Sequence, residues 1–193
     1  AIVDGQHRCY AAKLVGIERV PCMIIEATTA EQAASFAAIN GKRQKINELQ
    51  VHAAAIVSGD PKAIEIDRAV RSVKVEICRY PIPESHIKPR QTLALGTIAW
   101  IIRKYGASVL VLTLRCILEA HADDRGALRA NVIRATSDVL NELDELRPQR
   151  ALEISRQINF TRELVQARIR GSENQRSVRV ELVEELRRRF IKT

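Results

Sequence analysis

A short stretch near the start of the chain has residue types suited to binding an anion. It reads DGQHRCYAAK over residues 4–13, and the surrounding pattern places it where a strand meets a helix. A glycine at such a junction lets backbone amides come close to an anion, because no side chain blocks the approach. The free N–H groups and the dipole of the following helix attract phosphate, and Arg8 can add a bidentate contact. Gly5, Gln6, His7 and Arg8 therefore form a candidate phosphate site, although a glycine before a helix also occurs in purely structural roles.

A second basic turn follows the next helix. Residues 40–45 read NGKRQK and bring three cations together after an apolar helical stretch. Such a turn suits a clamp on the other end of a polyphosphate, with Asn40, Lys42 and Arg43 as the candidate contacts. The alternative is a solvated turn between two helices, and the sequence leaves both readings open.

The cysteines and histidines do not form a metal-binding pattern. Cysteines stand at positions 9, 22, 78 and 116 and histidines at 7, 52, 86 and 121, without the spacings of zinc sites. Four cysteines in a chain of 193 residues are ordinary in the reducing cytoplasm. We expect a cytoplasmic protein whose cysteines are small core residues.

The elements that position the basic motifs are expected to alternate between strand and helix. Residues 2–3 end a strand, residues 7–14 form a helix that Gly16 ends, and residues 20–25 are an apolar run of strand length. Thr29 then caps a second helix, which continues to Ile39 with apolar residues at helical spacing. This order indicates a small α/β domain. Because the chain opens on a strand and does not begin with Met, we expect the domain to be incomplete at its N-terminus.

The remainder of the chain is expected to be mainly helical. Residues 47–57 read as a helix, and Asp60 with Pro61 begins another. Residues 73–77 are a candidate strand ahead of a proline-rich stretch, residues 80–89, which is either a linker or a recognition loop. Further helices are expected over residues 91–105, 108–121, 128–146 and 149–170 and in a last segment to residue 190. Residues 172–175 have the spacing of a capping box for that last helix, so helix is favoured there over the strand that the alternation of residues 177–182 indicates.

The predicted fold class is therefore α+β, in three parts. A small α/β domain spans residues 1–58, a connecting segment with the proline-rich loop spans residues 59–90, and an all-helical domain spans residues 91–193.

The net charge of +8 is concentrated near the C-terminal end. Residues 147–193 contain twelve basic and six acidic residues, and so carry six of the eight net charges. This asymmetry predicts an acidic partner, nucleic acid first. The alternative is a solvated helical face rich in arginine. The candidate DNA contacts are Arg147, Arg150, Arg187, Arg188 and Arg189.

Membrane insertion is not expected. No apolar stretch reaches the ~18 residues that a bilayer span needs, and the first residues do not have the pattern of a signal peptide.

Taken together, the two basic motifs resemble a known superfamily. The resemblance rests on residues 4–8, AAK at 11–13, a strand around Val20-Pro21, and FAAIN at 36–40 followed by Lys42-Arg43. These are similar to the N-terminal domain of the ParB/sulfiredoxin superfamily, including its DGQHR-type branch, and cover about residues 1–58. The resemblance implies a ParB-like fold whose first nucleotide box would lie before Ala1.

The resemblance also implies roles for individual residues. Gly5, Gln6, His7 and Arg8 stand where ParB proteins have their GxxR phosphate-binding box. Asn40 and Arg43 match the Asn and Arg of a later ENxxR-like box, in which the Asn helps to hold magnesium beside the triphosphate. The implied cofactor is CTP or ATP with magnesium.

The chain departs from the family pattern at three places. Ile39 stands where ParB proteins carry the glutamate linked to hydrolysis, so slow or absent turnover is expected. Gln6 stands where sulfiredoxins carry their catalytic cysteine, so reduction of a sulfinic acid is not expected. The nearest candidate for the helix-turn-helix of ParB proteins is residues 95–118, but residues 109–114 are apolar on every face, which suits a core. Trp100 is likewise expected in the core.

The expected function is nucleotide-linked DNA binding, in the partition of plasmid, phage or chromosomal DNA or in transcriptional control. One alternative is a nuclease or NTPase of the same superfamily, although no pair of carboxylates accompanies the basic motifs. Another is a helical self-assembly module that forms a homodimer without binding DNA. The sequence leaves open whether the protein is an enzyme.

Overall fold

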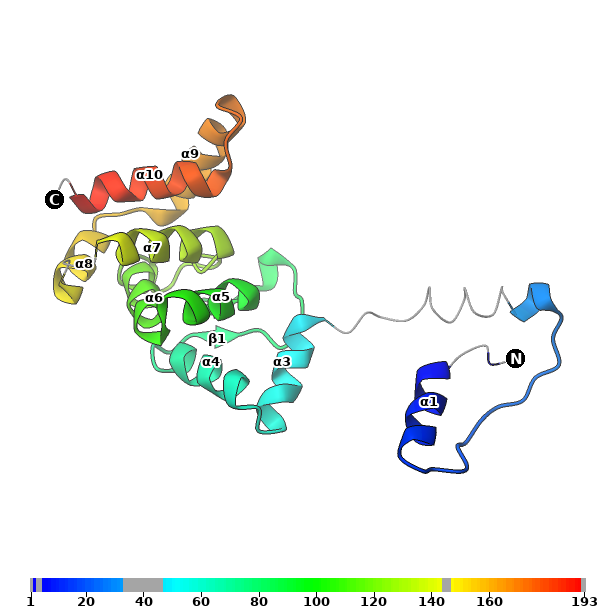
Figure 1. Cartoon of the computed structure of the whole chain (residues 1–193). Coiled ribbons are helices and arrows are strands. Elements are labelled where there is room, and N and C mark those ends of the chain that lie inside the picture. The colour runs from blue at the N-terminus through cyan, green and yellow to red at the C-terminus, as the bar shows by residue number, and fades with distance from the viewer. Residues whose placement is uncertain (1, 3–4, 33–46, 144–146, 192–193) are drawn as a thin grey trace. The chain divides into compact units, whose positions relative to one another are not determined.

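The computed structural model describes residues 2, 5–32, 47–143 and 147–191. The chain divides into two compact units, residues 1–45 and residues 46–193 (Figure 1). This division precedes helix α3 (Glu48–Val57), which the sequence analysis assigned to the first domain. α3 packs on helix α4 (Pro61–Arg71), and this contact explains its place in the second unit.

In the first unit, helix α1 (Gln6–Leu14) forms where the sequence predicts a helix. Gly16 ends it, as expected, with a left-handed φ of 76°. The Gly16 N–H donates to the Lys13 carbonyl and the Ile17 N–H to the Ala12 carbonyl, at 3.2 and 2.8 Å. This pair of hydrogen bonds is the Schellman motif, which satisfies carbonyls that the helix end leaves open.

A second helix of the first unit is described over its first turn, residues 29–32. Its cap is Thr28 rather than Thr29, because the Glu31 carboxylate accepts hydrogen bonds from the Thr28 N–H and hydroxyl, both at 2.8 Å. The Thr28 hydroxyl oxygen accepts from the Glu31 N–H at 3.3 Å, which completes a capping box. The expected continuation to Ile39 lies outside the described residues.

Residues 20–25, predicted as a buried strand, do not form one. Met23 and Ile24 are 89% and 88% exposed, and residues 5–32, all of them described, contain no strand. A strand needs a neighbour to pair its N–H and C=O groups, and an apolar run does not specify that neighbour. The described part of the first unit therefore lacks the alternating α/β order that the sequence predicted.

The second unit begins with two helices that start where the sequence predicts, and the cap of the second, Asp60, was also predicted. The Asn47 side chain accepts from the Leu49 N–H at 2.9 Å, and the Gln50 side chain accepts from the Asn47 N–H at 3.1 Å. At the start of α4, Asp60 accepts from the Ala63 N–H at 2.8 Å, with Pro61 in the first turn. Both caps satisfy amides that have no partner inside the helix.

One small sheet occurs in the described ranges. Strand β1 (Glu76–Ile77) pairs in parallel with strand β2 (Gln91–Thr92), and Glu76 lies opposite Gln91. Parallel strands need a crossover of about a dozen residues, and the proline-rich stretch supplies it. The crossover contains one 3₁₀ turn, η1 (Glu84–His86). The stretch therefore serves as a structural connection within the second unit.

The rest of the second unit is a set of helices around α6. These helices are α5 (Leu95–Tyr105), α6 (Ala107–His121), α7 (Ala130–Glu142), α8 (Pro148–Ser155), α9 (Phe160–Glu173) and α10 (Val178–Ile191). α6 packs against α4, α5, α7 and α8, and its Leu110, Leu114 and Ile117 are fully buried. The apolar helix after Gly106 is therefore a core helix, as the sequence predicted.

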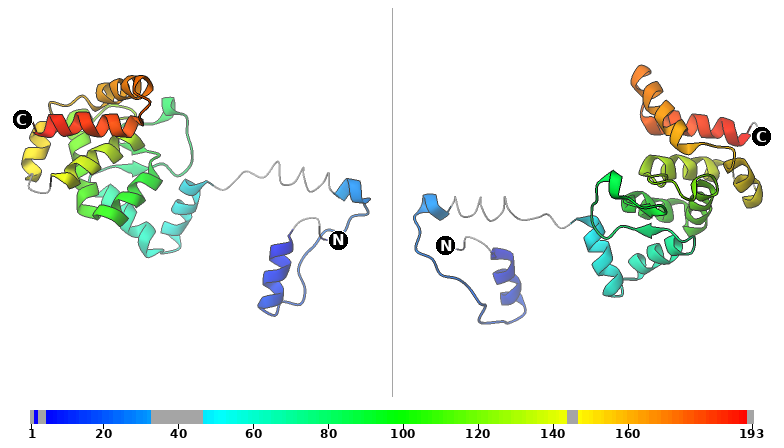
Figure 2. Two further views of the ribbon diagram at one scale, coloured as in Figure 1. Left: turned by 45° about the horizontal axis from the view of Figure 1, so that its top comes forward. Right: turned by 180° about the vertical axis from the view of Figure 1, so that it is seen from behind.

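The second unit is layered. α10 packs against α7 and α9, while α7 also packs on α5 and α6. Figures 1 and 2 show α9 and α10 as a hairpin on one side of α7, with α5, α6 and then α4 on the other side. Val70 and Val75, from the segment expected to connect two domains, are buried in this same core. The helical unit therefore includes residues 59–90.

The C-terminal helices differ from the prediction in two details. The helix expected over residues 149–170 is divided into α8 and α9, because Asn159 caps a new helix by accepting from the Arg162 N–H at 2.9 Å. Ser172, the expected cap of the last helix, lies instead in the last turn of α9. Ser177 takes that role, its hydroxyl oxygen accepting from the Val180 N–H at 3.3 Å.

The described part of the chain is thus mostly helical with one two-stranded parallel sheet. Within these ranges, no helix has both the length and the apolar composition needed to cross a bilayer.

Candidate functional site

The four residues of the first basic motif share the first turn of α1. Gly5 is the N-cap, with a φ of 89°, and Gln6, His7 and Arg8 follow it in the helix. The hydrogen bond from the Cys9 N–H to the Gly5 carbonyl, at 3.0 Å, begins the helical pattern. The amides that precede Cys9 in the helix therefore have no carbonyl acceptor inside it.

Among the described residues, this helix end lacks the groups that normally stabilise such a terminus. The N-cap residue offers no side-chain cap, and the first turn contains no acidic residue. The Arg8 side chain instead folds back over Gly5, so that a Cβ added at Gly5 would lie 3.2 Å from Arg8 Nη2. A cation at a helix N-terminus opposes the helix dipole, whereas a bound anion interacts favourably with both. The arrangement is chemically suited to a phosphate or carboxylate ligand.

The second basic motif lies outside the described residues. Asn40, Lys42 and Arg43 therefore remain predicted contacts for a polyphosphate, and Asn40 remains a predicted magnesium ligand.

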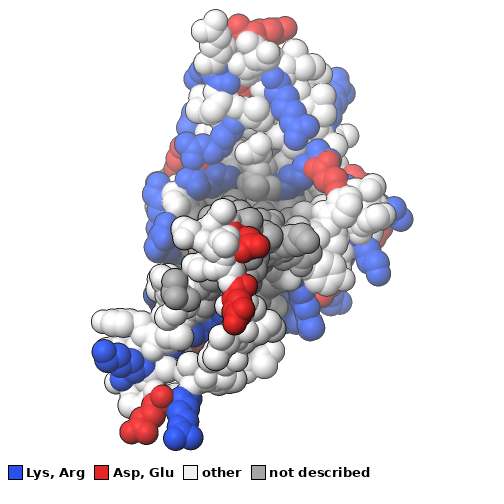
Figure 3. All heavy atoms as spheres, turned by 90° about the vertical axis from the view of Figure 1, so that its right-hand side faces the viewer, with Lys and Arg blue, Asp and Glu red and all other residues white. Residues whose placement is uncertain are grey.

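Four of the five C-terminal arginines predicted to contact DNA form ion pairs with carboxylates. The pairs are Arg150–Glu153 (3.1 Å), Arg187–Glu142 (2.6 Å), Arg188–Glu185 (3.2 Å) and Arg189–Glu163 (2.8 Å). Arg147 is exposed at the N-cap of α8, and no carboxylate in the described ranges pairs with it. In the upper part of Figure 3, where α9 and α10 lie, basic and acidic side chains are neighbours. Of these four carboxylates only Glu142 lies outside residues 147–193, so the excess of six positive charges is largely kept, and the predicted DNA contacts stay a prediction.

Sequence reasoning missed a second cationic cluster, at the C-terminal end of α5. Lys104 Nζ lies 4.8 Å from the centre of the Trp100 ring and 5.0 Å from that of Tyr105, and the two rings meet edge to face. From α7, Arg134 lies over the Trp100 ring, with its Cζ 2.9 Å from the ring centre. Trp100 is partly buried against the core but also carries these cations. The four-residue spacing of Trp100 and Lys104 within α5 can be seen in the sequence, whereas the contact of Trp100 with Arg134 depends on tertiary packing.

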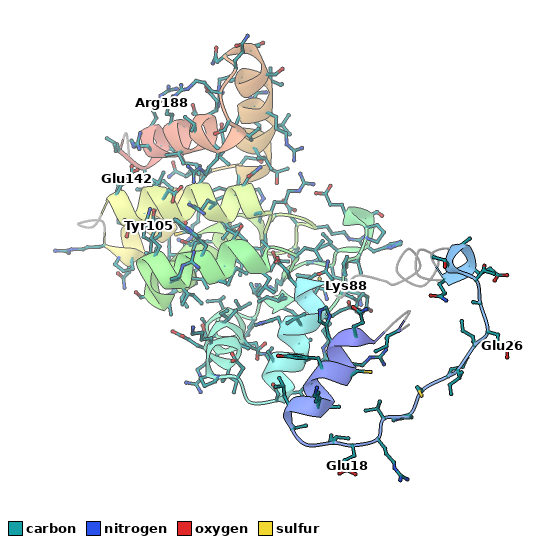
Figure 4. All side chains as sticks on the ribbon, turned by 45° about the vertical axis from the view of Figure 1, so that its right-hand side comes forward. Glu18, Glu26, Lys88, Tyr105, Glu142 and Arg188 are labelled. Atoms are coloured by element: carbon teal, nitrogen blue, oxygen red, sulfur yellow. The ribbon has the colours of Figure 1, made fainter. Side chains whose placement is uncertain are left out.

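A single carboxylate from α7 joins this cluster. Asp138 accepts a hydrogen bond from the Tyr105 hydroxyl at 2.9 Å, and lies 3.4 Å from Arg134 and 3.9 Å from Arg179. Burial and this hydrogen bond raise the pKa of Tyr105 to about 12. Figure 4 shows Tyr105 on the same side of the helical unit as Glu142, which lies near the end of α7. The Tyr105 phenol is therefore held in its protonated, hydrogen-bond-donating form.

His121 has a structural partner on each side of its ring. Its Nε2 accepts from the Phe160 N–H at 3.0 Å, so the proton of the neutral ring is on Nδ1, 2.6 Å from Asp124. The histidine thus satisfies one of the free amides at the start of α9.

The thiols are divided between core and surface. Cys78 and Cys116 are buried, as predicted, and burial raises the pKa of Cys116 to about 11. Cys22 is exposed and Cys9 is half-buried, so the prediction of a core position was wrong for Cys22. The described residues contain no group of three or more His, Cys, Asp or Glu side chains that could hold a metal ion.

Comparisons with protein-family models, with curated proteins and with solved structures found no match to this chain.

Proposed function

We propose that the first unit binds a nucleoside triphosphate, CTP or ATP with magnesium, by its phosphates at the N-terminus of α1. The observation that carries this proposal is the turn from Gly5 to Arg8, which has a left-handed glycine, no side-chain cap from the N-cap residue and a guanidinium folded over the helix end. Most helices place Ser, Thr, Asp or an acidic residue there. A phosphate would supply negative charge at this helix end.

The second basic motif would hold the other end of the nucleotide. In this proposal Lys42 and Arg43 contact phosphate oxygens and Asn40 helps to hold magnesium. The support is the order of the two motifs in the chain and their resemblance to the ParB boxes. Divalent magnesium bridges phosphate oxygens in most nucleotide sites, and one protein oxygen with waters is an ordinary ligand set.

DNA binding by the helical unit completes the proposed function. The chain would act in DNA partition or transcriptional control in the cytoplasm, with the nucleotide as a bound switch. The net charge of +8 supports a polyanionic partner, as does the resemblance of the N-terminal motifs to ParB proteins. Duplex DNA is therefore the proposed macromolecular ligand.

Calorimetric titration of the full chain with CTP, ATP and GTP in the presence of magnesium tests the nucleotide part. At least one nucleotide should bind, and Arg8→Ala should weaken it roughly tenfold or more, because a charge-assisted hydrogen bond contributes about 1.5–3 kcal/mol. The matched control is Lys13→Ala, which removes a cation from the last turn of the same helix. Binding of none of the three nucleotides, or equal binding by the two variants, would reject the site.

A further inference from the structure

We propose that the backbone of duplex DNA is bound by a surface made by Arg103, Lys104, Arg134 and Arg179, here called the α5–α7 cation surface. The inference rests on the DNA-binding part of the proposed function and assigns it to a place that the sequence did not indicate. The four cations come from three helices, α5, α7 and α10. Lys104 and Arg134 share the Trp100 ring, and Arg134 and Arg179 share Asp138. Arg103 is assigned to the surface because it is exposed next to Lys104 on α5.

The first argument is charge. Asp138 is the one carboxylate, in the described ranges, with which any of these four cations forms an ion pair. Arg134 and Arg179 share it at 3.4 and 3.9 Å. Arg103 and Lys104 are exposed and have no carboxylate partner there. By contrast, Arg187, Arg188 and Arg189 of α10 each have a carboxylate partner. Four cations against one carboxylate leave a local excess of positive charge.

The second argument is how the cations are held. Lys104 lies within 5.0 Å of two ring centres, and Arg134 covers the Trp100 ring. A ring attracts a cation through its quadrupole and does not cancel its charge, whereas a carboxylate does. The rings therefore hold both side chains in place, and the charge of Lys104, which has no carboxylate partner in the described ranges, stays available to an anion, while Arg134 shares its charge with Asp138. Fixing them beforehand lowers the entropy lost when a phosphate binds.

The chemistry of the surface favours duplex DNA over other anions. α5 and α7 are described in full and expose no large hydrophobic side chain, so the surface lacks the apolar groups that insert into a membrane. Because Arg134 covers the Trp100 ring, the ring is not offered to an unpaired base. Phosphates spaced along a duplex match a row of fixed cations, and such contacts read the backbone rather than the sequence.

The chain carries a natural reporter for this surface, because Trp100 is its only tryptophan. The full chain is titrated with a short, fluorescently labelled duplex across a series of salt concentrations. DNA anisotropy gives the affinity, and a parallel titration with unlabelled duplex follows tryptophan emission. We expect saturation with DNA to change the Trp100 emission, and log Kd to vary linearly with log salt.

A pair of double variants locates the contact. Arg103→Gln with Lys104→Gln should weaken DNA binding roughly tenfold and reduce the salt slope by about 2, as expected for two lost phosphate contacts. The control is Arg162→Gln with Arg168→Gln, which removes the same charge from exposed positions on α9. It should change the affinity by less than about threefold. Thermal unfolding of both variants identifies any loss caused by misfolding.

The proposal would be overturned by equal losses in the two double variants, by no change in tryptophan emission when DNA is saturating, or by equal affinity for anionic vesicles or polyglutamate at matched charge. Binding of DNA with the first or second result rejects this surface and leaves the proposed DNA function intact. No binding of DNA at all rejects both, while nucleotide binding at α1 is measured separately without DNA.

Discussion

Gly5 combines two requirements that can be separated by mutation. Its φ of 89° favours glycine, and a Cβ there would lie 3.2 Å from Arg8 Nη2. Gly16, just beyond the other end of α1, has a φ of 76°, and a Cβ at that position would have nothing within 4 Å. The two positions therefore share the backbone strain, about 1–2 kcal/mol for a residue with a side chain, and differ in the contact with Arg8.

Gly5→Ala should weaken nucleotide binding roughly tenfold, because the added methyl displaces the Arg8 guanidinium and the anion loses a charged contact. Gly16→Ala should leave the nucleotide Kd within about threefold of the unmodified chain, although it carries the same strain. Calorimetric titration of both variants checks this. Similar losses in the two would show that helix stability, rather than the Arg8 contact, governs binding.

Tyr105 gives a prediction for pH. Its pKa is raised from 10.0 to about 12 by burial and by the hydrogen bond to Asp138, so the folded chain holds the phenolic proton more tightly than the unfolded chain. The resulting stability is fully present below pH 10.0 and is lost as the pH rises through about 12.

The difference in tyrosinate absorbance between the unmodified chain and Tyr105→Phe should therefore show one phenol that ionises near pH 12. Tm of the unmodified chain should also fall more steeply than that of Tyr105→Phe above pH 10.0. Parallel pH profiles for the two chains would contradict the assigned hydrogen bond.

At the residue scale, sequence reasoning succeeded where the cause was local. It found Gly5 before the helix, Gly16 after it, and Asp60 with Pro61 at the start of α4. It did not find the pairing of Arg187 with Glu142, or of Arg134 with the Trp100 ring. Those contacts join residues that are far apart in sequence and meet only when α7 packs against α5 and α10.

The α9–α10 hairpin depends on one close backbone approach. A Cβ at Gly171, near the end of α9, would lie 2.8 Å from the Arg176 carbonyl oxygen. The Gly171 carbonyl also accepts from the Arg176 N–H at 3.0 Å, which closes the turn. The absence of a side chain at residue 171 therefore allows the two helices to meet.

Gly171→Ala should lower the free energy of unfolding by about 1–3 kcal/mol, because the backbone of the turn must shift. At a helix position with no close neighbour, a change from Gly to Ala would raise the free energy of unfolding by about 1 kcal/mol. The sign of the change in the free energy of unfolding therefore distinguishes the two cases. Ser172→Ala, at the exposed neighbouring position, is the matched control and should have little effect. Urea unfolding followed by circular dichroism gives both values, and a more stable Gly171→Ala chain would refute the close approach.

At the element scale, signals within each helix's own residues predicted α3 to α7 and α10. For α4 the signal was the Asp60-Pro61 start, and for α10 it was a capping-box spacing that was preferred over an alternating, strand-like pattern. Sequence reasoning joined α8 and α9 into one helix because it overlooked the local cap at Asn159, and the His121 ring that accepts the Phe160 N–H comes from a distant part of the chain. It also predicted a strand over residues 20–25, where the structure has no pairing strand among residues 5–32. Strands depend on a partner that composition does not reveal.

The charge of the whole molecule differs from what a count along the chain indicates. Residues 147–193 hold most of the net charge, but many of their arginines pair with carboxylates of α7, α8, α9 and α10. Exposed pairs of this kind add about 0–1 kcal/mol each to stability. Their greater effect is to hold these guanidinium groups on carboxylates, whereas Arg103 and Lys104 of the α5–α7 cation surface have no carboxylate partner in the described ranges.

The whole protein is expected to bind its nucleotide without rapid turnover. Ile39 occupies the place of the glutamate in the resembling family and can neither orient water nor hold magnesium. Phosphate release with magnesium and DNA present should be on the order of one per minute or slower, as in phosphoryl-transfer sites that lack a group positioning the attacking water. Faster release that is abolished by Asp4→Asn or by Glu48→Gln would show that another carboxylate supplies the missing group.

The central claim is that a triphosphate is held by the first turn of α1, and backbone amide NMR of the full chain tests it most directly. Adding CTP or ATP with magnesium should produce its largest shift changes at the amides of Gly5, Gln6, His7 and Arg8. Amides that donate a hydrogen bond to phosphate shift strongly because the anion polarises the N–H group. Arg8→Ala should remove these changes at the same nucleotide concentration. Shifts confined to other parts of the chain, or none at saturating nucleotide, would contradict the account.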